Sequence, residues 1–546
     1  MTVRSLSYKL KFLEHYREIF TAVADIEPLL ETHKRITDDL DAYLEKEEKR
    51  IATLKRHLKI YKSEHDKAMQ DIPNYLGNPI HAFTLIKRLT TDLDKLEHNI
   101  QIGTDYIKNI TMSVPDVKYP APEDLTGAAQ ALTRLQQTYE LKARDLSDGV
   151  INGMKYSNPM SSSDCFELGR SLYDVKEYHN ALPWFLESLR KYEDAEFNGF
   201  SEVDLMEYVA FSHYLMGELE EAIEWTEKIL VKDPLHPRAI GNIPHFKKAI
   251  IDKEDRKRRR DRGETGEHVE EEEYVANSYW NTEERLKYEA LCRGEMTVPD
   301  YIAKDLKCSY VTKTHPFLKI APIKVEQMYI KPDVFVFHQV MSDNEIEHIQ
   351  NIAKPRFQRA VVHNPETGAL EFAHYRISKS SWIKDHESEM IAAISRRVTD
   401  MTGLSMFSAE ELQVVNYGIG GHYEPHFDFS RVKEHGSFDG FIGNRIATVL
   451  FYMSDVAQGG ATVFTELGLS VFPIKGAALY WLNLHPSGEG DFATRHAACP
   501  VLRGSKWVSN KWIHQGGQEF IKPCNLEYQD EGINGKIAKP IRKSSR

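Results

Sequence analysis

The 546-residue chain lacks several features that would narrow its class at once. It has no run of about 18 apolar residues, so no transmembrane helix is predicted. None of its five cysteines forms a CxxC pair, which argues against a structural zinc site. Positive charge is not in excess, because the formal net charge is −12 at pH 7, and this removes any general case for nucleic-acid binding.

The two ends of the sequence also lack targeting signals. "MTVRSLSYKLKFLEHYREIF" has neither the continuous apolar core nor the small-residue cleavage site of a signal peptide. The last residues, "IRKSSR", are not a retention signal. Asn109 opens an Asn-Ile-Thr sequon, so it is a candidate glycosylation site if the chain enters the secretory pathway. The length alone predicts roughly three or four domains.

The N-terminal part of the chain, from residue 8 to about 110, has a helical pattern. It contains a short heptad seam with one missing position at Glu47. The apolar positions of the seam are Leu40, Leu44, Ile51, Leu54, Leu58 and Tyr61. We therefore expect residues 1–150 to form a helical dimerisation region with a coiled-coil-like segment. The alternative is an amphipathic helix packed on its own domain.

A different helical period, typical of TPR repeats, begins at residue 164. Small residues at Gly169, Ala181, Ala210 and Ala222 match positions where paired TPR helices approach each other. Two units are too few for a free solenoid. We therefore expect residues 157–251 to form a TPR-like module that holds an extended peptide.

One helix of this module carries Tyr208, Phe211 and Tyr214 three residues apart, so the rings share a face. Such a stripe is more often core than binding site. It also suits a proline-rich ligand in the polyproline II conformation, whose stiffness limits the entropy lost on docking. Arg238 and Asn242 are placed to bond the carbonyls of such a ligand.

The next segment, residues 252–325, reads as a charged linker and helical connection. Its basic block, Arg256 to Arg260, resembles a nuclear-localisation or nucleic-acid patch, but the adjacent acidic block would compensate that charge.

From about residue 326 the pattern changes to strands. A helix is expected at 343–354, and strands are expected in "DVFVFHQV", "LQVVNYG", "RIATVLFYMS", "ATVFTE", "GAALYWLN" and "KWVSNKWIH". Many strands without alternating helices indicate a double-sheet jelly roll, or double-stranded β-helix, over 326–524, followed by a tail at 525–546. The predicted fold class is α+β multidomain.

The stretch "HYEPHFDFSRV" places His426 and Asp428 two residues apart, on one face if the segment is a strand. His496 lies 70 residues further along the chain and completes a set of two histidines and one carboxylate. That set leaves octahedral positions open and is the arrangement of non-haem Fe(II) oxygenases. His422 and His514 are alternative ligands, and a surface histidine near an acid is the alternative to any metal.

Lys506 follows ten residues after His496, before an aromatic strand. A buried ammonium is costly unless an anion meets it. A dicarboxylate that binds iron at one end and Lys506 at the other would meet that need, which is the geometry of 2-oxoglutarate. An ordinary exposed lysine is the alternative.

The motifs "YEPHFDF", "GNRIATVLFYMSDV", "GGATVF", "ATRHAACPV" and "KWVSNKWIH" resemble the catalytic region of the collagen prolyl 4-hydroxylase α-subunit family, and the likeness extends over most of the chain. The resemblance implies iron ligands at His426, Asp428 and His496, and a distal 2-oxoglutarate carboxylate on Lys506. It implies further roles for two groups of residues. Around 2-oxoglutarate these are Tyr417, Thr462, Trp512 and His514; for the peptide substrate they are Tyr423, Arg445, Tyr173, Tyr208, Phe211, Tyr214, Arg238 and Asn242.

The resemblance also implies proline 4-hydroxylation in X-Pro-Gly repeats of procollagen or collagen-like chains, with O₂ and 2-oxoglutarate consumed and succinate and CO₂ released. It implies L-ascorbate as a further cofactor, the lumen of the endoplasmic reticulum, and a protein disulfide isomerase as β subunit of an α2β2 tetramer. It implies bridges Cys292–Cys308 and Cys499–Cys524, with Cys165 free. A hydroxylase of non-collagen proline-containing proteins and an inert peptide-binding chaperone are the rival functions.

Overall fold

The computed structural model describes residues 19–70, 122–193, 200–261, 282–363, 370–431 and 442–524. The chain divides into two compact units, residues 25–119 and residues 1–24 with 120–546. Asn109 and the tail 525–546 lie outside the described ranges. Among the helices within these ranges, none has the length and apolarity that crossing a bilayer requires.

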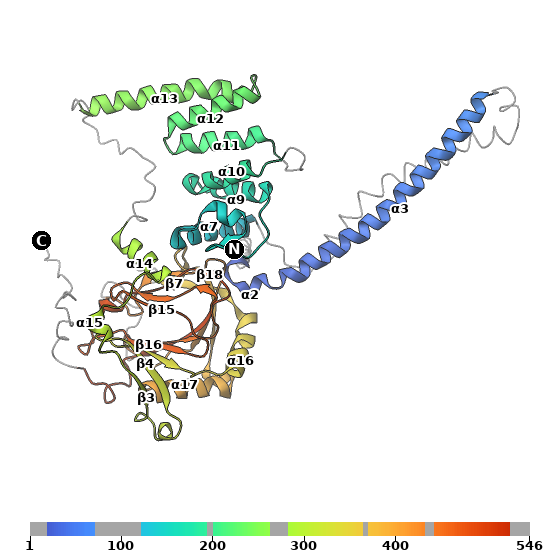
Figure 1. Cartoon of the computed structure of the whole chain (residues 1–546). Helices are drawn as coiled ribbons and strands as arrows, with labels where there is room; N and C mark the ends of the chain where they lie inside the picture. Colours follow the sequence, from blue (N-terminus) through green and yellow to red (C-terminus); the bar gives the residue numbers. More distant parts are fainter. Residues whose placement is uncertain are drawn as a thin grey trace, which may run out of the picture. The chain divides into compact units, whose positions relative to one another are not determined.

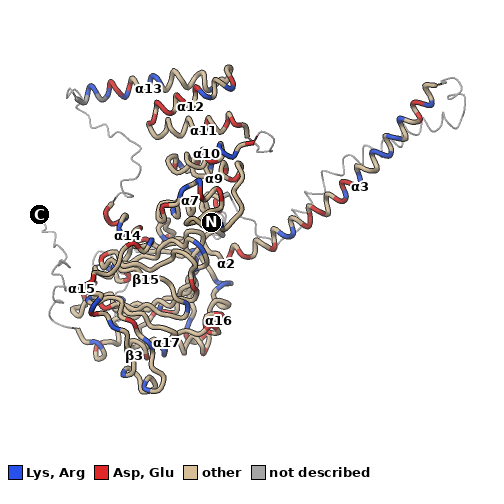
Figure 2. The backbone as a smooth tube through the Cα atoms, in the orientation of Figure 1, with Lys and Arg blue, Asp and Glu red and all other residues tan. Residues whose placement is uncertain are grey.

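The smaller unit is described through one long helix, α3, Leu29–Gln70. Acidic and basic residues alternate along it (Figure 2). In the described residues α3 buries none of its side chains, and its seam is open: Leu40 is 52% exposed and Leu58 is 55% exposed. The described residues therefore do not test the seam, and dimerisation remains a prediction.

The larger unit begins with short helices and a module of stacked helices (Figure 1). Ser161 and Ser201 start two of these helices with capping boxes, in which each serine exchanges hydrogen bonds with an aspartate three residues on. Gly169 lies so close to Phe185 that an added Cβ would come within 2.9 Å of its ring, which explains the small residue in the TPR pattern. The helices and strands of this part are η2 Ile19–Thr21, α2 Val23–Ile26, α7 Pro122–Tyr139, α8 Ala143–Ser147, β1 Val150–Ile151, β2 Met154–Lys155, α9 Ser162–Asp174, α10 Tyr178–Arg190, α11 Glu202–Leu215, α12 Leu219–Lys232 and α13 Pro237–Asp261.

The connection to the sheets contains α14 Glu283–Arg293 and α15 Asp300–Ala303. A nine-stranded sheet follows in the order β3-β4-β5-β16-β12-β19-β10-β9-β6, and a four-stranded sheet in the order β11-β17-β14-β15. The larger sheet already includes β3, Cys308–Val311, so it begins before the predicted boundary at 326. The α+β fold class and the β-rich C-terminal domain are confirmed.

The strands of the nine-stranded sheet are antiparallel in every pair. Each of the six strand windows predicted from the sequence contains one strand, and the predicted helix at 343–354 is α16. The bounds are β3 Cys308–Val311, β4 Ile323–Tyr329, β5 Val334–His338, β6 Gln358–Arg359, β9 Ser378–Ile383, β10 Leu412–Tyr417, β12 Arg445–Tyr452, β16 Ala478–Leu482 and β19 Trp507–His514.

The remaining strands build the smaller sheet and two short pairs. The four-stranded sheet consists of β11 Tyr423–His426, β17 His496–Ala498, β14 Thr462–Phe464 and β15 Leu469–Val471. The short pairs are β13 Gln458–Gly459 with β18 Val501–Arg503, and β7 Val361–His363 with β8 Leu370–Phe372. Other elements are α16 Asp343–Ala353, α17 Glu389–Thr402, and the 3₁₀ turns η4 Pro316–Lys319, η5 Lys354–Arg356, η6 Asp385–Glu387 and η7 Phe492–Thr494.

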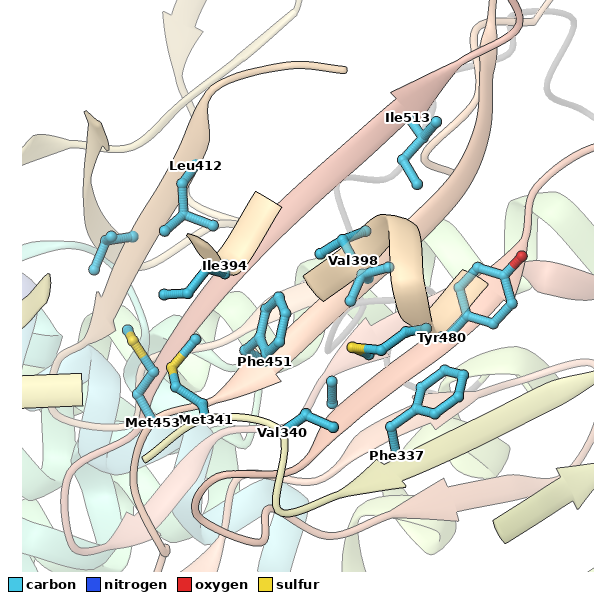
Figure 3. Close-up of a cluster of buried hydrophobic side chains, with 14 of the residues drawn as sticks. Phe337, Val340, Met341, Ile394, Val398, Leu412, Phe451, Met453, Tyr480 and Ile513 are labelled. Atoms are coloured by element: carbon cyan, nitrogen blue, oxygen red, sulfur yellow. The ribbon is translucent and has the colours of Figure 1, made fainter. Parts of the chain in front are cut away.

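The main core lies where α16 and α17 cover the nine-stranded sheet (Figure 3). Ile394 and Val398 of α17 point toward Phe451 of β12, and all three are almost fully buried. At about 25 cal/mol per Å² of apolar surface, this burial is the main force that holds the sheet flat against the helices. Residues that alternate to the other face of the central strands, such as Trp481 of β16 and Val508 of β19, belong to a second apolar cluster.

Candidate active site

His426, Asp428 and His496 come together although His496 lies 70 residues beyond His426 in the sequence. The imidazole Nε2 of His426 lies 3.8 Å from Oδ1 of Asp428, and Nε2 of His496 lies 3.7 Å from Oδ2. One ligand atom from each residue falls within 4.8 Å of the others, which is close enough for a single ion. The register explains the convergence, because His426 at the end of β11 pairs directly with His496 at the start of β17.

The predicted strand through His426 and Asp428 is only partly correct. β11 ends at His426, its register with β17 is irregular, and Asp428 lies in a bend beyond the strand. The two side chains therefore meet by a turn of the backbone and not by strand alternation. Strand alternation thus predicted the correct pair of residues, although a turn and not a strand brings their side chains together.

Hydrogen bonds set the orientation of both imidazoles. Nδ1 of His426 donates to the carbonyl of Glu424 at 2.7 Å, and Nδ1 of His496 donates to the carbonyl of Thr494 at 3.0 Å. These bonds leave each Nε2 as the lone-pair atom that faces the carboxylate, the tautomer a metal requires.

Electrostatics also favour metal-binding protonation states. Burial, reinforced by the neighbouring His496, lowers the pKa of His426 and keeps its imidazole neutral. Burial would raise the pKa of Asp428, but the adjacent His496 and His426 outweigh it and hold that pKa below its ordinary value. A neutral His426 beside an ionised Asp428 offers two of the ligands that a divalent cation binds.

A pocket surrounds this triad and includes five further residues that the sequence predicted. Three were predicted for the co-substrate, Tyr417, Thr462 and Trp512, and two for the peptide, Tyr423 and Arg445. The ring of Tyr423 stacks on His426 with the two centroids 3.6 Å apart. Thr462 accepts a hydrogen bond from the hydroxyl of Tyr452 at 2.9 Å.

Lys506 directly precedes β19 and is only 1% exposed, and it is not among the residues that line the pocket. Its Nζ has no hydrogen-bond partner in the described residues and lies 5.1 Å from the centre of the Tyr417 ring. Burial lowers the pKa of this ammonium to about 7. A buried, unpaired amine of this kind is rare in a stable protein, and an incoming carboxylate would supply the missing partner. The ordinary exposed lysine, left open above, is excluded.

Glu410 is a pocket residue that the sequence analysis missed. Its carboxylate binds Arg445, with Nη2 to Oε2 at 2.9 Å, and accepts from Nε2 of His514 at 2.9 Å. His514 also donates from Nδ1 to the carbonyl of Gly443, so both its nitrogens are engaged away from the triad, and it is not among the pocket-lining residues. The guanidinium of Arg445 stacks over Trp512 at 4.1 Å. No local pattern marks Glu410, because its partners are 35 and 104 residues away.

The helical module carries its own groove between α9, α11 and α13. Five of the six residues proposed for peptide binding line it: Tyr173, Tyr208, Phe211, Arg238 and Asn242. Arg238 is ion-paired to Glu207. Tyr214 is not among the lining residues, because its ring stacks on Phe246 and its hydroxyl bonds His245 at 2.9 Å.

The predicted disulfides are wrong. The structure joins Cys292 to Cys499, whereas Cys308 and Cys524 are unpaired and exposed. The reason is that α14 packs on the four-stranded sheet, which buries Cys292 and Cys499 in one cluster with a Cα–Cα distance of 5.5 Å. Cys165 is free and buried, as expected.

Three family descriptions match successive parts of this chain. "Prolyl 4-Hydroxylase alpha-subunit, N-terminal region" covers residues 22–153, and "Prolyl 4-hydroxylase peptide-substrate-binding domain" covers 162–252. "2OG-Fe(II) oxygenase superfamily" covers 412–514. Among relatives, prolyl 4-hydroxylase subunit alpha-2 of Caenorhabditis elegans is 45% identical over 521 residues, 94% of this chain and 94% of the relative. The chain belongs to the prolyl 4-hydroxylase α-subunit family.

A second relative agrees with this family. Prolyl 4-hydroxylase subunit alpha-1 of Homo sapiens is 42% identical over 513 residues, 93% of this chain and 95% of the relative. A viral collagen prolyl hydroxylase of known structure aligns with 33% of this chain at 23% identity and a TM-score of 0.27, too low to carry an argument. As a family member the chain is a 2-oxoglutarate-dependent prolyl 4-hydroxylase, and its triad and Lys506 fit Fe(II) and 2-oxoglutarate.

Proposed function

We propose that this prolyl 4-hydroxylase acts on X-Pro-Gly repeats of procollagen or collagen-like chains and adds a hydroxyl group to C4 of proline. The observation that carries the proposal is the buried Lys506, which has no hydrogen-bond partner among the described residues and lies against Tyr417, a residue of the pocket around the triad. The chain also has an aromatic groove in its helical module. When bound, Fe(II) and 2-oxoglutarate supply O₂ activation coupled to release of succinate and CO₂.

The residues take the following roles in the proposal. His426, Asp428 and His496 hold iron, and Lys506 binds the distal carboxylate of 2-oxoglutarate. Tyr417, Thr462 and Trp512 shape the co-substrate pocket. His514 helps to orient the co-substrate indirectly, because it holds Glu410, a residue of the pocket wall. Tyr423 and Arg445 face the proline and its backbone.

The groove of the helical module would hold a second stretch of the substrate. Aromatic rings and Arg238 suit a polyproline II chain, which presents rings and free carbonyls and loses little entropy on docking. Tyr173, Tyr208, Phe211, Arg238 and Asn242 would contact it, whereas Tyr214 would support the groove by joining α11 to α13 through His245 and Phe246. Phe211 offers no hydroxyl, so this position contributes packing alone.

We further propose the cellular setting of the family for this chain. L-ascorbate would restore iron that has oxidised in uncoupled turnovers. The chain would work in the lumen of the endoplasmic reticulum, with a protein disulfide isomerase as β subunit in an α2β2 tetramer. The open seam of α3 is the surface that would join the two α subunits.

The test is an iron- and 2-oxoglutarate-dependent assay on the full chain co-expressed with a disulfide isomerase. A (Pro-Pro-Gly)-type peptide should stimulate succinate release and gain 4-hydroxyproline. His496→Ala should abolish both while peptide binding persists. Faster turnover of proline-containing peptides without the Gly repeat would favour a non-collagen substrate, and peptide binding without any succinate would favour an inert chaperone.

A further inference from the structure

The carboxylate of Asp428 is held by a side chain that belongs to none of the roles above. Thr448, in the middle of β12, donates from Oγ1 to Oδ2 of Asp428 at 2.7 Å. Thr448 is 1% exposed and Asp428 is 6% exposed, so water does not compete for this bond. The terminal torsion of an aspartate is broad, and nothing within the side chain fixes the plane of its carboxylate.

A second residue sets the direction of this hydrogen bond. Asn483, which follows β16 and is fully buried, donates from Nδ2 to Oγ1 of Thr448 at 2.9 Å. The Thr448 hydroxyl has one hydrogen, and because Asn483 supplies a donor, that hydrogen is directed to the carboxylate. The reverse amide orientation would place two acceptors, Asn483 Oδ1 and Asp428 Oδ2, in competition for one hydrogen.

The backbone holds both ends of this chain of bonds. Thr448 sits between β16 and β19, opposite Trp481 and Trp512 in the register. The backbone N–H of Asn483 donates to the carbonyl of Ile446 at 2.8 Å. The pair is therefore built into the most central part of the nine-stranded sheet.

We infer that Thr448 and Asn483 are positioning residues for the metal site: their directed pair of hydrogen bonds holds the Asp428 carboxylate in the rotation that binds iron. This inference rests on the ligand set proposed above. Groups that orient a ligand in this way commonly change metal affinity 10- to 100-fold when they are removed.

The experiment measures Co²⁺ binding, by calorimetry and by the visible absorption bands of the bound ion, in the full chain co-expressed with a disulfide isomerase. Thr448→Val keeps the shape and removes the hydroxyl. We expect it to weaken Co²⁺ binding about 10- to 100-fold and to shift the bands. Thr448→Ser restores the hydroxyl and should return both readouts to within about threefold of wild type, since the donor is regained.

Asn483→Asp tests the direction of the bonds, because it is isosteric and replaces the donor by an acceptor. We expect a loss at least as large as that of Thr448→Val. Thr465→Val is the matched control: Thr465 is also 1% exposed, and its hydroxyl has no partner among the described residues. Its Co²⁺ affinity should equal that of wild type.

The outcomes distinguish a failure of the proposed ligand set from a failure of the positioning role. If His496→Ala binds Co²⁺ as well as wild type does, the ligand set fails and the inference fails with it. If His496→Ala loses Co²⁺ but Thr448→Val and Asn483→Asp keep wild-type affinity and bands, the ligand set stands and the positioning role is overturned. If Thr448→Val does not fold, Asn483→Asp and Thr448→Ser still decide.

Discussion

Lys506 should make the ligand-free enzyme less stable than it would be without this lysine. Burial lowers the pKa of its ammonium from 10.5 to about 7, and no described residue pairs with it. A shift of this size corresponds to a cost of about 5 kcal/mol in the free energy of unfolding, as an order of magnitude. We expect Lys506→Met, which keeps the length and removes the charge, to stabilise the ligand-free protein.

The pH dependence has a definite sign. Below pH 7 both the folded and the unfolded chain carry the charged lysine, so the full cost is present. Between pH 7 and about 10.5 the folded chain loses the proton while the unfolded chain keeps it, and stability rises with pH. The advantage of Lys506→Met in urea unfolding should therefore be largest below pH 7 and shrink as pH increases.

Lys511→Met is the matched control for this prediction. Lys511 is also buried and burial lowers its pKa, but its Nζ lies 3.3 Å from Oδ1 of Asp385, and this carboxylate opposes the shift. This variant should therefore gain less stability below pH 7 than Lys506→Met does. A Lys506→Met protein that is less stable than wild type below pH 7, or an advantage that does not change with pH, would refute the reasoning.

The same shift predicts that co-substrate binding takes up a proton. At pH 8 about nine tenths of free Lys506 is neutral, and a bound carboxylate would restore its charge. Calorimetry of 2-oxoglutarate binding in buffers of different ionisation enthalpy should show uptake of about 0.9 proton at pH 8 and about 0.1 at pH 6. Lys506→Met should show neither uptake nor tight binding.

Three further predictions test the packing of the helical module, the role of Glu410 and the disulfide pairing. Gly169→Ala should destabilise the helical module by about 1–3 kcal/mol in thermal unfolding, because the new Cβ meets the ring of Phe185; an unchanged melting temperature would contradict the packing. Glu410→Gln should cost about 1–3 kcal/mol and raise the KM for peptide, because the partly buried guanidinium of Arg445 loses its carboxylate; a peptide KM equal to wild type would argue against its role. Peptide mapping without reduction should recover Cys292 joined to Cys499, and a bridge to either exposed cysteine would overturn the pairing.

The strands and the metal triad could be predicted because each depends on a local pattern. Runs of β-branched, aromatic and other apolar residues marked strands such as β12, and a histidine two residues from an aspartate marked the first two ligands. The chain after His426 turns out of the strand, and only the register of β11 with β17 explains why His496 meets it. The identities of the ligands could therefore be predicted from the sequence, while the course of the backbone that brings them together could not.

Other parts of the site depend on contacts that leave no local signal. Glu410 is an ordinary acid in a polar loop until Arg445 and His514 approach it across the sheet. The disulfide pairing depends on where α14 docks, and cysteine spacing carries no information about that. Thr448 did leave a faint signal, since a hydroxyl at the centre of an otherwise apolar strand must have a partner when it is buried.

The two charged groups that matter most to the chemistry have opposite effects on folding. The ammonium of Lys506 has no hydrogen-bond partner among the described residues and opposes folding in the absence of ligands. The adjacent histidines lower the pKa of Asp428, so its ionised form is favoured in the folded chain. The cost at Lys506 is tolerated because a large apolar core behind the nine-stranded sheet holds β12 and β19 in place regardless of the pocket. Binding of a dicarboxylate would remove that cost, so the ligand-bound enzyme should be more stable than the empty one.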